Sequence, residues 1–272
     1  MNIIYLKTGK NLERQLCHCL NGQHSEIKDA IAFLKNATYP GKGSTSSEIY
    51  IIAAHYDSGS STPGTAPGAT DDATGCAVVL EFARIMSQYD FNSTLKFAFW
   101  NGEEIGLVGS NNYASYASSS SLDIKLNLNY DSTAYDPTSN FILDILYDSA
   151  TTDVKDLEVQ HNTIYGIGFA SFNYNVHASC GGDHESFRYY GFDAVSSHTE
   201  LHGPQYHQPT DTVDKVNIEF AKKNAQIGMS TIAWLAGIYT GPVAEFNLFL
   251  MPVIMSGLLV IAIVWRLQNR KD

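Results

Sequence analysis

The stretch IYIIAAHYD, residues 49–57, indicates the fold class. Its first six residues are all apolar, and an unbroken apolar run of this length is typical of a strand that is buried on both faces of a sheet. The run stops at His55, and Asp57 follows two residues later. Residues 95–100 and 126–130 are two further expected strands, and acidic residues come soon after each of them. We therefore expect a sheet whose buried strands deliver polar side chains at their ends.

Segments with helical spacing of apolar residues separate these strands. Residues 74–89 show this spacing, and residues 217–239 form a long amphipathic helix that ends before Gly241 and Pro242. A loop rich in Gly, Ser, Thr and Pro covers residues 58–69. The remaining expected elements are strands at 2–7, 141–147 and 192–196 and helices at 25–34, 104–116, 149–159 and 183–190. Strands that alternate with helices predict an α/β fold, in which a mostly parallel mixed sheet is sandwiched between helices.

Acidic residues and histidines gather at the expected strand ends. In an open α/β sheet, ligands bind in the crevice beyond the carboxyl ends of the strands. His55, Glu103 and Asp131 each follow an expected strand, so three strands bring side chains that can bind a metal to one edge. Asp71 and Asp72 lie in a loop just before a helix. The sequence therefore predicts a metal site at this edge of the sheet.

These residue types suit hydrolysis at a pair of metal ions. Two cations about 3.5–4 Å apart lower the pKa of a shared water and polarise a carbonyl group. Histidine nitrogens and carboxylate oxygens are zinc ligands. Because two close cations repel each other, a bridging anion is needed, and Asp71 or Asp72 is placed to supply it. Glu103 and Glu104, at a turn into a helix, can divide the work, with one binding a metal and the other remaining free as a base.

Each motif taken alone also has a structural explanation. A pair such as Asp71-Asp72 often caps a helix, and two glutamates at a helix start interact favourably with the helix dipole. A single histidine after a buried strand is more often a hydrogen-bonded core residue. The functional interpretation therefore depends on the motifs occurring together. Seven other histidines stand at positions 18, 24, 161, 177, 184, 198 and 202. We expect His184, beside Asp183, to line the cleft and the other six to be structural or at the surface.

Five motifs in this order resemble the co-catalytic zinc aminopeptidase family, the metallopeptidase family that also contains glutamate carboxypeptidases and glutaminyl cyclases. They are His55-Tyr56-Asp57, the segments 68–75 and 102–110, Asn129-Tyr130-Asp131, and Tyr206-His207 with Asp211-Thr212. The resemblance covers roughly residues 49–240. It implies the zinc-aminopeptidase, phosphorylase-like fold, two Zn²⁺ ions per chain, and removal of N-terminal residues from peptide substrates.

The resemblance also implies a set of metal ligands in this sequence. Asp71 would bridge the two zinc ions. His55 and Asp131 would complete the ligands of one ion, and Glu104 and His207 those of the other.

Two further residues take catalytic roles in the same resemblance. Glu103 would accept the proton of the bridging water and pass it to the leaving amine. Asp57 would hydrogen-bond the far nitrogen of His55 and so fix its tautomer. Three residues are expected in supporting or substrate-side roles: Asp72, Asp183 and Asp211.

Other functions within the same fold stay open at this point. A glutamate-type carboxypeptidase needs guanidinium groups to hold a substrate carboxylate, and only Arg84 and Arg188 lie in the matched region. Arg188 is expected on a surface helix, which disfavours this alternative. A glutaminyl cyclase typically uses one metal, whereas the ligand set here favours two. A catalytically inactive membrane-bound ectodomain would be expected to have lost ligands or the base, and Glu103 is retained.

Net charge and cysteine content limit the classes of binding partner. The formal net charge of −11 argues against a nucleic-acid partner, because phosphate binding needs clustered Lys and Arg. The four cysteines, at positions 17, 19, 76 and 180, have no zinc-finger spacing. Neither observation fixes the oligomeric state.

The C-terminal region predicts a membrane anchor. Residues 246–265 form an uncharged, mostly apolar run, and a helix of this length spans the roughly 30 Å core of a bilayer. We therefore expect a catalytic domain at residues 1–243, in which 11–47 looks like an insertion. Residues 244–272 would then be a transmembrane helix with a short basic tail.

Charge around this run predicts the orientation in the membrane. Arg266, Arg270 and Lys271 follow the apolar run, so the tail is expected in the cytoplasm and the catalytic domain outside. The first residues do not resemble a signal peptide, so we expect either that the natural start lies upstream or that the protein is a tail-anchored cytosolic enzyme. The favoured expectation is a single-pass protein of the cell membrane.

Overall fold

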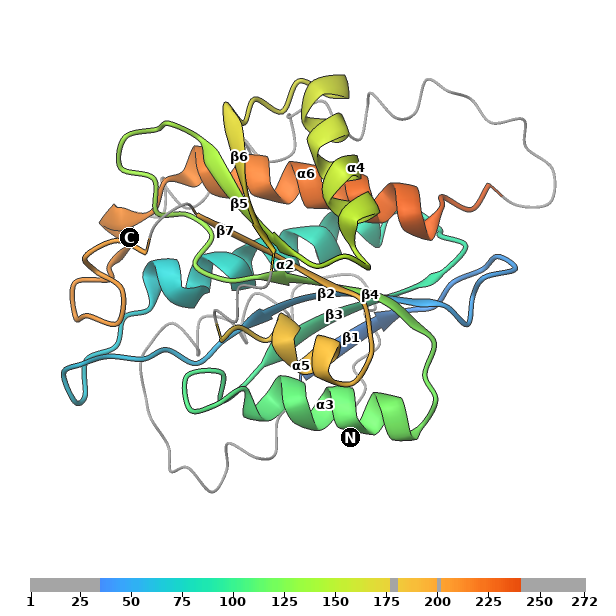
Figure 1. The fold of residues 1–272 in the computed structure, drawn as a ribbon, viewed down its shortest axis with the longest axis horizontal. Helices are drawn as coiled ribbons and strands as arrows, with labels where there is room; N and C mark the ends of the chain where they lie inside the picture. The colour runs from blue at the N-terminus through green and yellow to red at the C-terminus, as the bar shows by residue number, and fades with distance from the viewer. Residues whose placement is uncertain (1–34, 177–180, 200–201, 241–272) are drawn as a thin grey trace.

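The computed structural model describes residues 35–176, 181–199 and 202–240 (Figure 1). Three expected segments lie outside these ranges: the strand at 2–7, the helix at 25–34 and the membrane helix at 246–265. Within the described ranges, no helix is both long and apolar enough to cross a membrane.

A seven-stranded mixed sheet forms the middle of the molecule, in the order β1-β3-β2-β4-β7-β5-β6. The four central strands β3, β2, β4 and β7 run parallel to one another. β1 is antiparallel to β3, and β5 is antiparallel to β7 but parallel to β6. The strands are β1 (Lys35–Tyr39), β2 (Ile49–His55), β3 (Thr94–Trp100), β4 (Ile124–Tyr130), β5 (Ile142–Tyr147), β6 (Ser171–Val176) and β7 (Ala194–Thr199).

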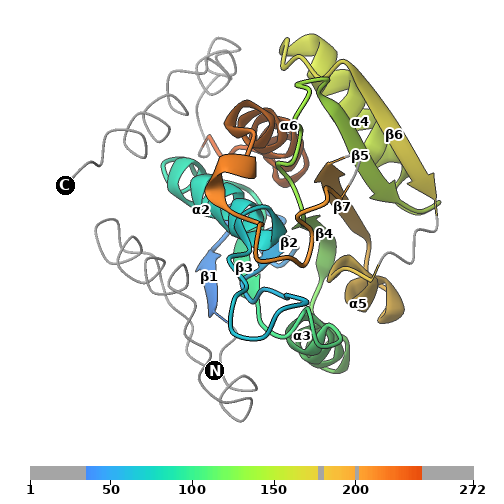
Figure 2. The same cartoon turned by 90° about the vertical axis from the view of Figure 1, so that its left-hand side faces the viewer.

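Helices cover both faces of this sheet. α2, α4 and α6 lie on one face, and α3 and α5 lie on the other (Figures 1 and 2). The helices are α2 (Thr74–Met86), α3 (Val108–Ser119), α4 (Thr152–Ile164), α5 (His184–Tyr189) and α6 (Ile218–Ala236). Two short helical turns, η2 (Ala69–Ala73) and η3 (Val213–Lys215), lie in the connections. The expected α/β fold with a mostly parallel mixed sheet between helices is therefore confirmed.

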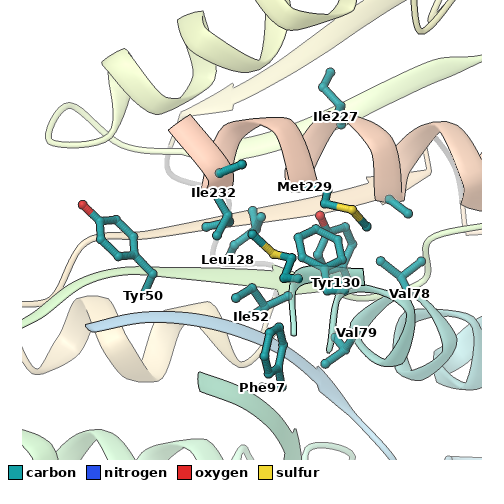
Figure 3. Close-up of a cluster of buried hydrophobic side chains, with 14 of the residues drawn as sticks. Tyr50, Ile52, Val78, Val79, Phe97, Leu128, Tyr130, Ile227, Met229 and Ile232 are labelled. Carbon is teal, nitrogen blue, oxygen red and sulfur yellow. The ribbon is translucent and has the colours of Figure 1, made fainter. Parts of the chain in front are cut away.

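Strand β2 explains why residues 49–54 are all apolar. Side chains alternate between the two faces of a strand. Tyr50, Ile52 and Ala54 pack into the larger apolar core beneath α2 and α6, part of which Figure 3 shows. The intervening residues Ile49, Ile51 and Ala53 pack into a second core against α3 and α5. Because helices cover both faces, no position on this strand can be polar before its end.

One close approach fixes the position of α6 over the sheet. The hydroxyl of Tyr130, the last residue of β4, points toward α6 (Figure 3) and occupies the space where a Cβ atom on Gly228 would stand. Any larger residue at position 228 would push α6 away from the end of β4. The geometry of this strand end matters because Asp131 follows directly.

The structure differs from the sequence-based expectation at several boundaries. Helix α3 begins at Val108 rather than near 104, because Gly106 and Leu107 adopt positive φ angles and hold residues 103–107 in a turn. Strand β7 continues through Thr199 instead of ending at 196. The strands β1 and β6 were not expected at all.

Candidate metal centre

The predicted site residues meet at one edge of the sheet. Strands β2, β3, β4 and β7 are parallel, so their carboxyl ends lie on the same side. His55 is the last residue of β2, and Asp131 follows the last residue of β4. Glu103 and Glu104 lie in the turn between β3 and α3, and His207 lies in the connection from β7 to α6. Asp71, in η2, comes from the connection that follows β2.

The carboxylate of Asp71 lies between two histidines. Its Oδ1 atom is 3.1 Å from Nε2 of His55, which is also 3.7 Å from Oδ1 of Asp131. Its Oδ2 atom is 3.2 Å from Nε2 of His207, which is 2.9 Å from Oε2 of Glu104. Each of the two oxygens therefore faces its own histidine and its own second carboxylate.

These five residues form two groups that fit metal ions. Ligand atoms of His55, Asp71 and Asp131 all lie within 4.8 Å of one another, and so do those of Asp71, Glu104 and His207. Asp71 belongs to both groups. In the described part of the chain, the ion pairs of Asp71, Asp131 and Glu104 are all with histidines, and none is with Lys or Arg. A cluster of carboxylates without a basic side chain calls for cations, and the nitrogen and oxygen donors suit zinc.

Without bound metal ions, protonation of the histidines balances the negative charge of the carboxylates. Burial lowers the pKa of His55, but its contacts with Asp131 and Asp71 outweigh burial and hold that pKa well above the ordinary value. Burial raises the pKa of Asp71, but contacts with His207 and His55 bring it below the ordinary value. Because a zinc-bound histidine must be neutral, metal ions and protons compete for these nitrogens.

Glu103 lies beside both groups without belonging to the five ligands. It shares a third cluster with His55 and Glu104, again with ligand atoms within 4.8 Å of one another. Burial raises the pKa of Glu103 to about 9, and the neighbouring acids Asp131, Asp183 and Glu104 act in the same direction. A carboxylate in such surroundings takes up a proton readily, as a general base must.

The structure corrects the expected contact between Asp57 and His55. The Nδ1 atom of His55 lies 3.0 Å from the main-chain carbonyl oxygen of Asp57, whereas the Asp57 carboxylate is 3.8 Å from it. That carboxylate instead accepts hydrogen bonds from the main-chain N–H groups of Glu103 and Glu104, each at 3.2 Å. Asp57 thus fixes the turn that carries the candidate base and a candidate ligand.

Two of the expected supporting residues hold the Asp71 segment in place. Asp211 accepts hydrogen bonds from the main-chain N–H groups of Thr70 and Asp71 and from the Thr70 hydroxyl. Asp72 is buried and accepts a bond from the N–H of Gly75 in the first turn of α2, which is the helix-capping role noted as an alternative from sequence. The peptide bond between Asp71 and Asp72 is cis.

The loop after β2 runs against the two ligands of the second group. The N–H of Gly59 donates to Oε1 of Glu104 at 2.5 Å, and the N–H of Ser61 donates to the carbonyl oxygen of His207 at 2.9 Å. A Cβ atom on Gly59 would stand 2.5 Å from Oε2 of Glu104, so glycine is needed there for space. The loop therefore helps to set the Glu104 carboxylate.

A row of rings on the Asp131 side was missed by sequence reasoning. His184, which was expected to line the cleft, is fully buried. Its ring lies 6.4 Å from that of His198, which in turn lies 6.4 Å from His202, between ring centroids. Burial raises the pKa of Asp131, but its interactions with His198, His55 and His202 outweigh burial and hold that pKa below the ordinary value. No local motif marks His198 and His202, because they come together only through the path of the β7–α6 connection.

Tyr206 was quoted from sequence only as part of a motif and given no role. Its ring stacks on that of His207, with centroids 3.8 Å apart. Burial and the surrounding acids raise its pKa, so the hydroxyl stays protonated. Asp183 is fully buried near His55 and Asp131, and burial raises its pKa to about 7.

Neither arginine of the matched region contacts the candidate ligands. Arg84 pairs with Glu81 on α2. Arg188 is not the surface group that was expected, since its side chain is mostly buried and donates to the carbonyl oxygens of Ala194 and Leu146. These pairings disfavour a site that holds a substrate carboxylate with arginine.

Comparisons with known proteins agree with this geometry. Residues 36–232 match the model of a family described as peptidase family M28. The aminopeptidase YwaD of Bacillus subtilis is 29% identical over 180 residues, which cover 63% of this chain and 38% of that protein. A probable zinc metalloprotease of Pyrenophora tritici-repentis is 39% identical over 109 residues, covering 39% of this chain and 24% of that protein.

A solved structure shares the fold. The aminopeptidase from Aneurinibacillus sp. strain AM-1 superposes with a TM-score of 0.63 at 28% sequence identity, over 78% of this chain and 50% of that one. The chain thus spans half or less of the length of each of these three relatives.

Proposed function

Since this chain belongs to peptidase family M28, and its similar proteins include two aminopeptidases and a probable zinc metalloprotease, we propose that it is a di-zinc aminopeptidase. It would remove N-terminal residues from peptides. The observation that carries the proposal is the double contact of Asp71, whose two oxygens face His55 and His207 separately. A carboxylate whose two oxygens face separate histidines is placed to bridge a pair of close cations.

The proposed ligands divide into two sets around Asp71. His55 and Asp131 would hold one zinc ion, and Glu104 and His207 the other, with Asp71 shared between them. When bound, two such ions supply an activated water and polarise the scissile carbonyl. Burial raises the pKa of Glu103. The positive charge of the ions would act in the opposite direction and favour the ionised form of this carboxylate.

The chain's own residues then account for the proton transfers. Glu103 would take the proton of the attacking water and return it to the leaving amine. Asp57 would hold Glu103 at the correct place through the main-chain hydrogen bond. The Tyr206 ring stacks on that of His207, and its protonated hydroxyl would be a hydrogen-bond donor for a substrate carbonyl.

Three alternatives within the family are less well supported. The glutamate-carboxypeptidase alternative lacks arginines at the site, because Arg84 and Arg188 are paired elsewhere. An inactive membrane-bound ectodomain of the same fold would not need Glu103 in a buried position beside the ligands. A glutaminyl cyclase with one metal would leave one of the two ligand groups without a purpose.

A panel of small substrates tests the proposal. The purified full chain should hydrolyse aminoacyl-anilides with a free α-amine and not the same compounds with a blocked amine. A strong zinc chelator should abolish the activity, and added Zn²⁺ should restore it. Cleavage of blocked substrates alone would contradict an aminopeptidase, and full activity in the chelator would contradict a metal mechanism.

The location of the enzyme is part of the proposal. Residues 246–265 would anchor the protein in the cell membrane, with the catalytic domain on the extracytoplasmic side. Protease added to intact cells should then degrade the domain that contains residues 49–240. Protection of this domain until the cells are lysed would contradict the proposed orientation.

A further inference from the structure

Three aromatic rings of the β7–α6 connection form one stack that ends on a candidate ligand. The rings of His202 and Tyr206 have centroids 4.2 Å apart, with an angle of 34° between their planes. Those of Tyr206 and His207 are 3.8 Å apart at 19°. Tyr206 therefore lies between a histidine that has no assigned role and a histidine that faces Asp71.

His207 lacks the supports that fix the other candidate histidine ligand. The side chain of His55 is almost fully buried, and its Nδ1 atom contacts the carbonyl oxygen of Asp57. The side chain of His207 is 38% exposed. Among residues 35–176, 181–199 and 202–240, no hydrogen bond to Nδ1 of His207 is found. Its backbone also adopts a φ of 53°, in a region that residues other than glycine seldom occupy.

A metal-binding histidine usually needs its ring orientation fixed. In most sites, a hydrogen bond from the second ring nitrogen does this, and its loss weakens metal binding about 10- to 100-fold. At His207 the Tyr206 ring instead stacks on the face of the imidazole, and the His202 ring in turn contacts the Tyr206 ring. A stack of three rings leaves little freedom for the middle and last rings to rotate.

We propose that His202 is a positioning residue, which acts through Tyr206 to hold the His207 ring in the orientation that binds the second metal ion. His202 does this by ring contact and is not itself a ligand. In agreement with that, it belongs to none of the groups of ligand atoms found among the described residues. The inference rests on the proposed metal site and adds a residue that the site motifs do not contain.

The test compares His202→Ala with His202→Phe in the full chain. Zinc affinity is measured by competition with a chromophoric chelator, and the geometry of each site by the visible spectrum of the Co²⁺-substituted protein. His202→Ala should lower the affinity for one of the two ions about 10- to 100-fold and change the Co²⁺ spectrum, while the affinity for the other ion stays the same. His202→Phe, which keeps a flat ring over Tyr206, should restore the affinity and the spectrum.

The control is Tyr189→Ala, since Tyr189 is a largely exposed ring that packs on Tyr190 away from the site. This variant should bind both ions as the unmodified chain does. Unchanged affinity in His202→Ala would overturn the positioning role, and so would a loss that His202→Phe fails to restore, because that pattern indicates direct ligation. Failure of the unmodified chain to bind zinc would instead refute the proposed function.

Discussion

Asp71 and His207 come from distant parts of the chain, yet Oδ2 of Asp71 lies 3.2 Å from Nε2 of His207. The other oxygen of the same carboxylate lies 3.1 Å from Nε2 of His55. Asp71 is therefore the one residue that both proposed ligand sets share. Removing the charge of Asp71 should weaken the binding of both ions. Removing a ligand that belongs to one set only should weaken the binding of one ion.

The variant Asp71→Asn should lose most of its zinc, because an amide cannot supply two anionic oxygens to a bridging position. His207→Ala should keep one of the two ions, because His55, Asp71 and Asp131 stay in place. Metal content after dialysis against a weak chelator, measured by plasma mass spectrometry, distinguishes the two variants. Equal losses in both would show that Asp71 is not the shared ligand.

Glu103→Gln should separate catalysis from metal binding. Its carboxylate belongs to neither proposed ligand set, so metal content should stay unchanged while the rate of anilide hydrolysis falls about 10²- to 10⁴-fold. Glu104→Gln is the matched comparison, because the same substitution one residue later removes a proposed ligand and should lower the zinc affinity. A Glu103→Gln enzyme with normal turnover would exclude this residue as the base.

Gly59→Ala should weaken zinc binding through Glu104. The added methyl group would stand 2.5 Å from Oε2 of Glu104, so this oxygen, which also contacts His207, must shift. Gly64→Ala is a control in the same loop, because nothing lies within 4 Å of its added methyl group. Its positive φ predicts a stability loss of about 1–2 kcal/mol, with zinc affinity unchanged. Similar zinc affinities in both variants would contradict the contact.

The stability of the metal-free protein should depend on pH through Glu158. This residue of α4 is fully buried, and neither of its oxygens finds a hydrogen-bond partner within the described ranges. Burial raises its pKa from 4.5 to about 8. The folded state thus binds the proton more tightly, so this contribution is complete below pH 4.5 and is lost as the pH rises through 8, by about 1.4 kcal/mol per unit at most.

Glu158→Gln should remove that slope. Urea unfolding in the presence of a chelator between pH 5 and 8 measures it, and the difference between the two proteins isolates the contribution of Glu158. The exposed Glu219→Gln on α6 is the control and should leave the slope unchanged. Parallel stability curves for the unmodified chain and Glu158→Gln would mean that Glu158 is ionised in the folded protein.

The central part of the fold could be predicted because its signals are local. β2 is buried on both faces, so its sequence must be apolar until His55, where the chain reaches the open edge of the sheet. The edge strands β1 and β6 have no such constraint, and their sequences KNATY and SFNYNV carry polar residues throughout. Their pairing depends on neighbouring strands, which sequence periodicity cannot show.

In the site, too, local sequence patterns could be predicted, whereas contacts between distant segments could not. The proposed ligands follow strand ends or lie in short acidic motifs, and these patterns are visible along the chain. The contact of Asp57 with the N–H groups of Glu103 and Glu104 depends on how the 103–107 turn is shaped by Gly106 and Leu107. The stack of His202 on Tyr206 depends on a connection that sequence does not position. Interactions of this kind can be recognised only in the three-dimensional structure.

The late position of His207, after the last strand of the sheet, has a consequence for synthesis. A polypeptide emerging from the ribosome contains His55, Asp71, Glu104 and Asp131 well before it contains His207. Until the β7–α6 connection has left the exit tunnel, a nascent chain can complete the first ligand set only. The proposed peptidase would therefore lack its second ligand set during most of translation, and chain order alone would delay any cleavage of peptides by unfinished copies.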